Sequence, residues 1–386
     1  MKILHICLGC FYIDNFSYQE NMIPKFHKKM GYDVEILAST LSFDNSGNAC
    51  NVEDKVYVNE YGIKVTRLPY KRGIPSKIGK FFRLYEGVDK KLELIKPDIL
   101  FIHGCQFCDI KYVVNYAKNH KVKIYVDNHA DFSNSARNWI SKNIMHKIVW
   151  KHCAQLILPY CTKFYGVLPA RVDFLKEMYK IPKDKVELLV MGADDDMVNE
   201  VQSENKCNQI RTQYGITDTD FLIITGGKID HAKEQVIKLL DAIKTLNCPK
   251  IKCIVFGSIV DDMKEKVLSF CDNEQIIYVG WLNNKETYEF LYASDLAIYP
   301  GRHSVLWEQT VGLGIPMIVK YWEGTTHVDV GGNVKFLKED SVEETQSLIT
   351  DMISGEEYLN MKKVAEVKGI KEFSYGYIAR KSIEEK

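Results

Sequence analysis

The chain has 386 residues, of which 46% are hydrophobic and 26% charged, proportions typical of a soluble globular protein with two domains. Its 51 basic residues balance its 51 acidic residues, and this zero net charge argues against a nucleic-acid-binding protein. No run of about 18 apolar residues occurs, which argues against a transmembrane helix.

Strands and helices alternate along the first half. A helix is expected over Tyr18–Lys29, where polar and apolar residues alternate with helical spacing before Gly31. Short, nearly continuous apolar runs predict buried parallel strands. These runs are KILHI, DVEILAS, KPDILFIHG, KVKIYVDNH, QLILPY and KVELLVMG.

The alternation stops at a polar stretch, 196–215, which we interpret as a linker, and then restarts. Helices are expected over Glu234–Leu246 and Asp261–Cys271. The predicted strands of this half are FLIITGG, KIKCIVFG, QIIYVGW, DLAIYPG and PMIVKYW. We therefore predict an α/β protein with two Rossmann-like, doubly wound parallel-sheet domains, 1–195 and 196–370, in which a C-terminal helix at about 371–386 packs back on the first domain.

One segment combines basic charge with an apolar stripe. Residues 1–195 carry an excess of eight positive charges, which is concentrated in Lys64–Lys96. A single helix over Lys77–Lys96 would place Phe81, Tyr85, Val88, Leu92 and Ile95 on one face. That helix could lie on a membrane surface or could pack on its own domain. We expect a cytoplasmic protein, with peripheral binding to the inner face of the cell membrane as one option.

The eleven cysteines form an odd set without the density of a secreted domain, which indicates a reducing compartment. Two pairs, Cys7-x-x-Cys10 and Cys105-x-x-Cys108, each follow a predicted strand. Adjacent strand ends could bring four thiols together around zinc. The alternative is that these residues are small apolar side chains beside the sheet, and we expect no metal.

The segment PGRHSVLWEQTVGLGIP (300–316) predicts a turn followed by a short helix. The backbone N–H groups of Ser304, Val305 and Leu306 would lie at the helix N-terminus, where they attract anions. Glu308 follows one turn later and could accept hydrogen bonds from a hydroxylated ligand. A nucleotide offers both groups, since its phosphates bind amides and its ribose binds a carboxylate.

A second glycine-rich turn follows the strand FLIIT. It reads Gly226-Gly227-Lys228-x-x-x-x-Lys233. Glycine lets the backbone approach a ligand closely, and Lys228 and Lys233 place two cations just beyond it. With the helix N-terminus, these lysines could hold a diphosphate without a metal ion. The first turn of the chain, CLGCF, lacks the G-x-G-x-x-G pattern of a dinucleotide-binding dehydrogenase.

Together these segments resemble the retaining glycosyltransferases of family 4, which have the GT-B fold. The resemblance covers nearly all 386 residues. The matching segments are Gly227-Lys228 with Lys233, Met191-Gly192-Ala193-Asp194, Tyr278-Val279-Gly280-Trp281, Ser304 to Gln309 with Gly314-Ile315-Pro316, and the N-terminal SYQENMIPKFHKKMGYDVEILAS. The last of these resembles the first helix and second strand of the family.

The resemblance implies a role for each matching residue. Lys228 and Lys233 would bind the donor diphosphate, Glu308 would bind the ribose, and Gly280-Trp281 would border the base. Gly9, in the loop after the first strand, would face the diphosphate. His129, in VDNHADF, would lie near the reacting sugar and act in catalysis with the two lysines, and His103 is a weaker candidate.

The chain departs from the family pattern at one position. Family members place two glutamates eight positions apart, but Pro300 stands eight residues before Glu308, and Arg302 and His303 occupy a shortened turn. The nucleotide role of Glu308 survives this change, whereas the contacts to the donor sugar are left open.

The function implied is retaining transfer of a sugar from a nucleotide diphosphosugar to a glycan or a polyprenyl-diphosphate-linked acceptor, as in bacterial polysaccharide synthesis, without cofactor or metal. Two alternatives stay open: a nucleotide-sugar epimerase of the same fold, and a silent member that only binds a nucleotide sugar.

Overall fold

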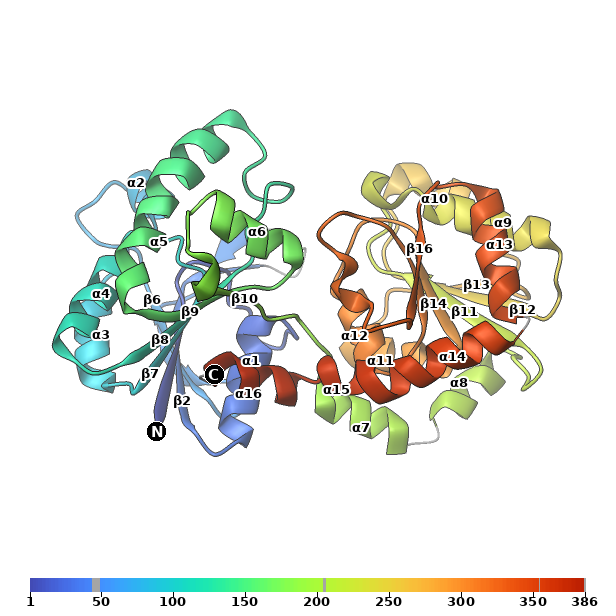
Figure 1. Ribbon diagram of the computed structural model, residues 1–386, viewed down its shortest axis with the longest axis horizontal. Coiled ribbons are helices and arrows are strands. Elements are labelled where there is room, and N and C mark those ends of the chain that lie inside the picture. The colour runs from blue at the N-terminus through green and yellow to red at the C-terminus, as the bar shows by residue number, and fades with distance from the viewer. Residues whose placement is uncertain (44–48, 204–205, 354, 385–386) are drawn as a thin grey trace. The chain divides into compact units, whose positions relative to one another are not determined.

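The computed structural model describes residues 1–43, 49–203, 206–353 and 355–384 (Figure 1). The chain divides into two compact units, Met1–Val190 with Ile378–Lys386, and Met191–Tyr377. Each unit is a sheet covered by helices on both faces, and no helix among the described residues has the length and apolar character needed to cross a membrane.

The first unit is built on an eight-stranded sheet in the order β10-β9-β8-β7-β1-β2-β6-β5. All neighbouring strands are parallel except β5 and β6. The strands are β1 (Lys2–Cys7), β2 (Asp33–Ser39), β5 (Val56–Val58), β6 (Lys64–Leu68), β7 (Ile99–His103), β8 (Lys123–Asn128), β9 (Cys161–Gly166) and β10 (Val186–Leu188), and β3 (Leu41–Phe43) pairs separately with β4 (Ala49–Asn51).

Helices α3, α4 and α5 cover one face of this sheet, and α1 and α16 cover the other (Figure 1). The alternation of side chains in β1 places Leu4 and Ile6 in the main apolar core and directs His5 to the opposite face. The helices are α1 (Gln19–Lys29), α2 (Ser76–Phe82), α3 (Val88–Ile95), α4 (Ile110–Asn119), the π-helix η1 (Ser141–Trp150), α5 (Lys151–Ile157), α6 (Pro169–Glu177) and α16 (Tyr375–Ile383), with short 3₁₀ turns η2 (Leu158–Tyr160) and η3 (Lys183–Lys185).

The second unit contains a six-stranded, wholly parallel sheet in the order β13-β12-β11-β14-β15-β16. From β11 the chain adds strands first toward one edge of the sheet, as β12 and β13, and then toward the other edge, as β14, β15 and β16. The point between β11 and β14 is the topological switch point, where open parallel sheets bind ligands. The strands are β11 (Phe221–Gly226), β12 (Ile251–Phe256), β13 (Ile276–Gly280), β14 (Leu296–Tyr299), β15 (Met317–Lys320) and β16 (Val334–Leu337).

Helices α9, α10 and α13 pack on one face of this second sheet through an apolar cluster that includes Leu239, Val267 and Ile349. The remaining helices are α7 (Asp195–Ser203), α8 (Lys206–Gln213), α9 (Val236–Leu246), α10 (Asp261–Leu268), α11 (Asn284–Ala293), α12 (Leu306–Gly312), α13 (Val342–Ile353), α14 (Glu356–Val364), the π-helix η6 (Ala365–Gly369) and α15 (Ile370–Glu372), with 3₁₀ turns η4 (His231–Lys233) and η5 (Thr326–Val328).

Three predictions about elements were wrong. The expected linker, 196–215, contains most of α7 and all of α8, because Val198, Val201 and Ile210 are buried. The segment QLILPY belongs to α5 and η2, and the strand follows it as β9.

The single helix predicted over Lys77–Lys96 is two helices, α2 and α3. Arg83 and Gly87 adopt left-handed backbone conformations, with φ of 52° and 72°, and these interrupt the helix. Tyr85, Val88 and Leu92 are buried in the core, so most of the predicted apolar stripe faces the protein.

Candidate nucleotide-binding site

The carboxyl ends of β11 and β14 lie on either side of the switch point, and the candidate donor-binding residues of the second unit follow these two strands, except Gly280 and Trp281 at the end of β13. The turn after β11 holds Gly227 at φ +101°. A Cβ atom at that position would lie 3.1 Å from Leu306 Cδ1 and 3.3 Å from Lys233 Nζ. The structure therefore brings Gly227, Lys233 and the first residue of α12 together, although Lys233 and Leu306 are 73 positions apart in the sequence.

A small pocket lies at this edge. Its walls come from the two strand ends, from η4 and from the loop before α12, and the lining residues include Gly226, Lys233, Pro300, Gly301, Arg302, Ser304 and Trp307. Gly301 is required here, since a Cβ atom would lie 2.9 Å from Lys233 Cα. Pro300, eight residues before Glu308, forms part of the wall and presents no carboxylate.

Lys233 is the cation of this pocket. It makes no ion pair among the described residues, and burial lowers the pKa of its ammonium group. Asp230 acts on the Lys233 ammonium only from beyond ion-pair distance, so this partly desolvated cation is a ready partner for a phosphate. In the first turn of α12, the N–H groups of Trp307 and Gln309 already donate to the carbonyls of Ser304 and Val305. The Leu306 N–H has no acceptor among the described residues, as expected at the start of a helix.

Lys228 lies differently from Lys233. It is solvent-exposed and does not line the pocket. Its predicted role in binding a diphosphate is therefore separable from that of Lys233 by experiment.

Three glycine turns are stacked along the same edge of the sheet. Gly257, after β12, packs so closely on Gly227 that a Cβ atom would lie 1.9 Å from the Gly227 carbonyl oxygen. The Gly257 N–H donates to the Gly280 carbonyl over 2.6 Å, which ties the turn after β13 to the stack. Trp281 follows this turn with 72% of its surface exposed, as a residue that stacks on a base could be.

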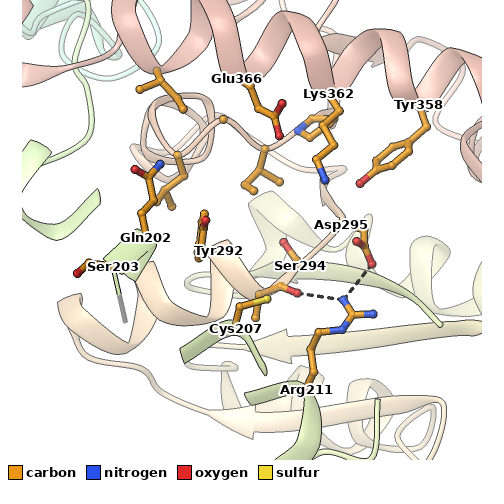
Figure 2. A pocket seen from close by; sticks show the side chains of 16 residues that line it. Gln202, Ser203, Cys207, Arg211, Tyr292, Ser294, Asp295, Tyr358, Lys362 and Glu366 are labelled. Carbon is orange, nitrogen blue, oxygen red and sulfur yellow. Dashed lines mark hydrogen bonds and ion pairs between the residues drawn. The ribbon is translucent and has the colours of Figure 1, made fainter. Parts of the chain in front are cut away.

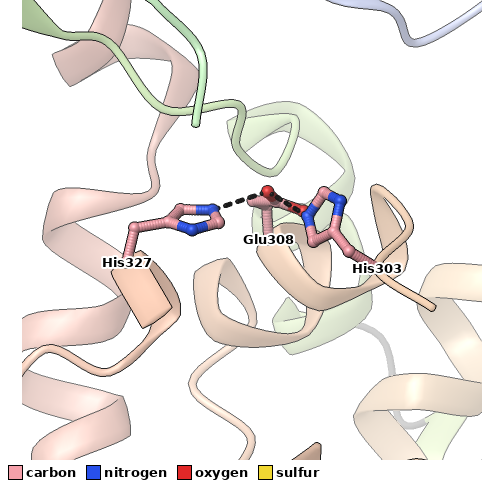
Figure 3. A group of neighbouring side chains, drawn as sticks. All are labelled: His303, Glu308 and His327. Atoms are coloured by element: carbon pink, nitrogen blue, oxygen red, sulfur yellow. Dashed lines mark hydrogen bonds and ion pairs between the residues drawn. The ribbon is translucent and has the colours of Figure 1, made fainter. Parts of the chain in front are cut away.

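Glu308 is fully buried, and its Oε1 atom accepts hydrogen bonds from two histidines (Figure 3). The Nε2 atoms of His303 and His327 lie 2.7 Å and 2.8 Å from this oxygen. Burial opposes ionisation of the carboxyl, but the two histidines outweigh it and hold the pKa of Glu308 well below its usual range. Oε2 is buried without a hydrogen-bond partner among the described residues.

The same three side chains could hold a divalent cation, since their ligand atoms lie within 4.8 Å of one another. Two nitrogens and a carboxylate oxygen would suit zinc. The N–O separations below 3 Å are, however, those of direct hydrogen bonds, so the structure explains the group without an ion. His327 was not predicted as a site residue, because nothing in the segment TTHVDV marks a ligand.

The predicted residues of the first unit lie at the carboxyl ends of β1 and β8. Gly9 packs on the turn after β7, where a Cβ atom would lie 2.2 Å from the Gly104 carbonyl oxygen. Arg83 donates to the Gly9 carbonyl, an anchoring contact that the sequence did not indicate. His129 is 32% exposed, and its Nε2 atom lies 3.6 Å from Asp127 Oδ2. His103 is fully buried and bonds the same carboxylate.

The cysteine pairs do not form a four-thiol cluster in the described part of the chain. Cys7 interacts with Cys10, whereas Cys108 interacts with Cys153 of α5. Cys105 is buried, and all eleven cysteines are free thiols. Within the described ranges, the group of metal-ligating side chains around Glu308 includes none of them.

A larger cavity, of about 630 Å³, lies at the opposite edge of the second sheet (Figure 2). Asp295 and Pro316, which precede β14 and β15, help to line it. Arg211 in this cavity is held by Asp295 Oδ2 at 3.1 Å and by the Ala293 carbonyl at 3.2 Å. The guanidinium of Arg211 therefore links α8 to the residues that precede β14. The cavity is at the opposite edge of the sheet from the glycine turns.

Two Rossmann-like units with a ligand edge at the switch point define the GT-B fold, and comparison with solved structures agrees. A glycosyltransferase from Rickettsia africae superimposes with a TM-score of 0.68 at 15% identity, covering 99% of this chain and 96% of that one. HepE of Anabaena, solved with UDP and glucose, gives 0.64 at 14% identity over 99% and 98%.

A UDP-GlcNAc 2-epimerase from Neisseria meningitidis gives a TM-score of 0.62 at 14% identity, over 98% of each chain. No family model matches the sequence. Among curated proteins, an uncharacterized 41.2 kDa protein in the cps region of Klebsiella pneumoniae is 27% identical over 122 residues. That match spans about a third of each chain (32%).

Proposed function

We propose that the protein is a retaining glycosyltransferase that uses a nucleotide diphosphosugar. The observation that carries the proposal is the unpaired, half-buried Lys233 beside the Gly227 turn and the first turn of α12. These groups suit a diphosphate, and HepE, which has the same fold, was solved with UDP and UDP-glucose. In this proposal Lys228 is a second, outer phosphate ligand.

In the proposed reaction the bond between the anomeric carbon and the diphosphate oxygen breaks, and a bond to the acceptor oxygen forms on the same face. The acceptor proton goes to the leaving phosphate oxygen. Negative charge grows on the diphosphate as the bond breaks, so Lys233 and the α12 amides stabilise the transition state more than the ground state. His129 orients the sugar, and no metal ion is needed.

The acceptor in this proposal is a glycan or a polyprenyl-diphosphate-linked sugar at an anionic membrane surface. Support comes from exposed apolar side chains around η1, where Trp139, Ile140, Ile144 and Ile148 are 69, 57, 39 and 62% exposed. Basic side chains accompany them, namely Arg137, Lys142, Lys147 and Lys151. Apolar side chains interleaved with lysines suit an anionic lipid interface.

The primary test is a thermal-shift screen against UDP, GDP, ADP and CMP and their sugars, with and without EDTA. One nucleoside diphosphate is expected to raise the melting temperature, because a ligand that binds only the folded state stabilises it by mass action. The shift is expected to survive EDTA. Absence of a shift with every nucleotide at millimolar concentration would contradict the proposal.

Nucleotide-sugar epimerisation is the second candidate, favoured by the likeness to two solved 2-epimerases. The two activities separate in one assay, since an epimerase converts the nucleotide sugar without an acceptor. A transferase releases the nucleoside diphosphate only when the acceptor is present, and NMR of the product then shows the anomeric configuration of the donor.

A further inference from the structure

A row of ionisable side chains crosses the first sheet on the face that α1 covers. His5 in β1, His103 in β7 and Asp127 in β8 all lie on this face and are fully buried. His27 of α1 packs on this face, next to His5, and is also fully buried. Apolar side chains of similar volume at these positions would make the folded protein at least as stable. Stability alone therefore does not explain these ionisable side chains.

The four side chains form one continuous hydrogen-bonded chain. Asp127 Oδ2 lies 2.7 Å from His103 Nδ1, and His103 Nε2 lies 3.0 Å from His5 Nδ1. His5 Nε2 lies 3.1 Å from His27 Nδ1. His27 Nε2 lies 2.9 Å from the carbonyl oxygen of Ala379, in the part of α16 that belongs to the first unit.

The end of the row at the Ala379 carbonyl determines which group donates in each hydrogen bond of this chain. The Ala379 carbonyl can only accept, and the Ser382 hydroxyl, 3.2 Å from the same Nε2 atom, donates its own proton to this carbonyl over 2.8 Å. His27 therefore carries its proton on Nε2 and accepts at Nδ1. His5 then donates from Nε2 and accepts at Nδ1. His103 must therefore donate from Nε2, and its Nδ1 faces a carboxylate, so one extra proton belongs to the His103–Asp127 pair.

The electrostatics agree with this assignment. Burial lowers the pKa of His5 well below its usual range and that of His27 to about 4, so both are neutral. Burial also opposes a charged His103, but Asp127 raises the pKa of His103 to about 9. Burial opposes a charged Asp127 as well, and His103 and His129 outweigh it. Glu20 of α1 and Cys7 of β1 are the other titratable groups that act on His103.

The near end of the row reaches His129, whose Nε2 atom lies 3.6 Å from the same Asp127 oxygen. This distance is beyond a hydrogen bond, so Asp127 acts on His129 through its charge. We propose that His103, backed by His5 and His27, is a positioning relay that keeps Asp127 ionised and so holds His129 as the Nε2–H tautomer, with Nδ1 free to accept from a sugar hydroxyl. The role of His129 in this statement rests on the proposed glycosyl transfer, whereas the proton arrangement does not.

The proton arrangement is tested on the unmodified protein by nitrogen-15 NMR of histidine-labelled samples, with His5→Gln, His27→Gln and His103→Gln for assignment. At pH 7 we expect one buried imidazolium, at His103, which loses its proton only near pH 9. His5 and His27 are expected as neutral Nε2–H tautomers. A neutral His103 at pH 7, or an Nδ1–H tautomer at His5 or His27, would overturn the relay.

The positioning role is tested with a matched pair of variants at the far end of the row. His27→Gln keeps one donor and one acceptor, whereas His27→Leu keeps neither. We expect His27→Leu to lower kcat by about ten- to a hundredfold, as for loss of outer hydrogen-bond partners of functional histidines, and His27→Gln to restore most of it. The KM for the donor is expected to stay unchanged in both.

His103→Gln adds a pH readout. Without the cation, burial raises the pKa of Asp127, so the acidic limb of the kcat profile should move to higher pH. Unchanged kcat and pH profiles in folded His27→Leu and His103→Gln would refute the positioning role. If these variants do not fold, the NMR result on the unmodified protein decides. A wild-type protein without transfer activity would refute the proposed function and leave the NMR test intact.

Discussion

At the scale of single residues, Lys233 offers the sharpest test of the donor site. Its ammonium group has no ion-pair partner in the described part of the chain and lines the pocket beside Gly227. We expect Lys233→Met to lower turnover by about a hundredfold or more, the cost of removing one charge-stabilising donor. We also expect this variant to show a smaller nucleotide-induced rise in melting temperature than the wild-type protein.

The matched control is Lys264→Met, which removes an exposed lysine of α10 in the same unit. Lys228→Met should fall between the two, because Lys228 is exposed and lies outside the pocket lining. Transfer at a near-normal rate by Lys233→Met would remove this lysine from the proposed mechanism.

Glu308 gives a prediction about stability and pH. Its folded-state pKa is depressed, so its contribution is fully present above the unfolded value of about 4.5 and is lost as the pH falls toward the folded value. We expect His327→Ala to destabilise the protein at pH 7 by about 1–3 kcal/mol, because it orphans one buried partner of this carboxylate. Urea denaturation at pH 7 and pH 4 measures this.

The loss should be nearly as large at pH 4, because that pH still lies well above the folded-state pKa of Glu308. His231→Ala is the control, since His231 and its partner Asp262 are both exposed. A loss at pH 7 no larger than that of His231→Ala would show that Glu308 does not depend on His327.

At the scale of elements, the stacked glycine turns shape the ligand edge of the second sheet. Gly257→Ala would place a Cβ atom 1.9 Å from the Gly227 carbonyl oxygen and would also strain a residue at φ +108°. Gly355→Ala is a matched control, because φ there is +113° but no atom lies within 4 Å of the new Cβ atom.

The control should therefore cost only the backbone strain, about 1–3 kcal/mol. Gly257→Ala should cost more and should also abolish the nucleotide-induced shift, because the turn carrying Gly227 must move. Equal melting temperatures for the two variants would mean that the contact between the turns is unimportant.

The exposed apolar side chains around η1 predict membrane binding. Ile144→Asp with Ile148→Asp should reduce co-sedimentation with vesicles of phosphatidylglycerol and phosphatidylcholine at low salt, since apolar contact is lost and negative charge is added. Leu359→Asp, at an exposed leucine of the second unit, is the control. Unchanged co-sedimentation of the double variant would move the membrane contact elsewhere or exclude it.

Elements were predictable wherever a local signal decides them. Strands such as β1, β2 and β11 were found because a parallel strand buried on both faces is a short apolar run. The helix over Tyr18–Lys29 matches α1 within one residue. The break between α2 and α3 was missed, because non-glycine residues such as Arg83 rarely adopt a left-handed conformation and no pattern marks them.

The site was predictable in part for a similar reason. Gly227 and Lys233 lie in one turn, so their proximity follows from the sequence. The row from Asp127 to His27 was not predictable, because it depends on the strand order β8-β7-β1 and on which face each histidine occupies. Nothing local distinguishes His5 in KILHIC from any other residue of a buried strand.

At the scale of the whole molecule, the chain enters the second unit at Met191 and returns to the first at Ile378. The returning segment is bound through Ala379, and through the Ile383 carbonyl, which accepts from Tyr125 over 2.9 Å. A truncation after Tyr377 should therefore destabilise the first unit and leave nucleotide binding by the second.

Limited proteolysis measures this prediction, with cleavage expected in the first unit of the truncated protein. The nucleotide that raises the melting temperature in the thermal-shift screen is expected to protect only the second unit. A truncation after Ile383 is the control, because it keeps both contacts. A first unit that resists proteolysis equally in both truncations would make the returning segment dispensable.

The return of the chain also has a consequence for biosynthesis. A ribosome delivers residues 1–190 first, yet these residues lack the segment that covers His27 and Tyr125 until 378–384 emerge. Domains generally fold as units during synthesis. The second unit can therefore complete its folding before the helix α16 of the first unit has been synthesised. The unit whose synthesis begins first is therefore the last to complete its fold. Until then, the end of the row at His27 is not covered by α16.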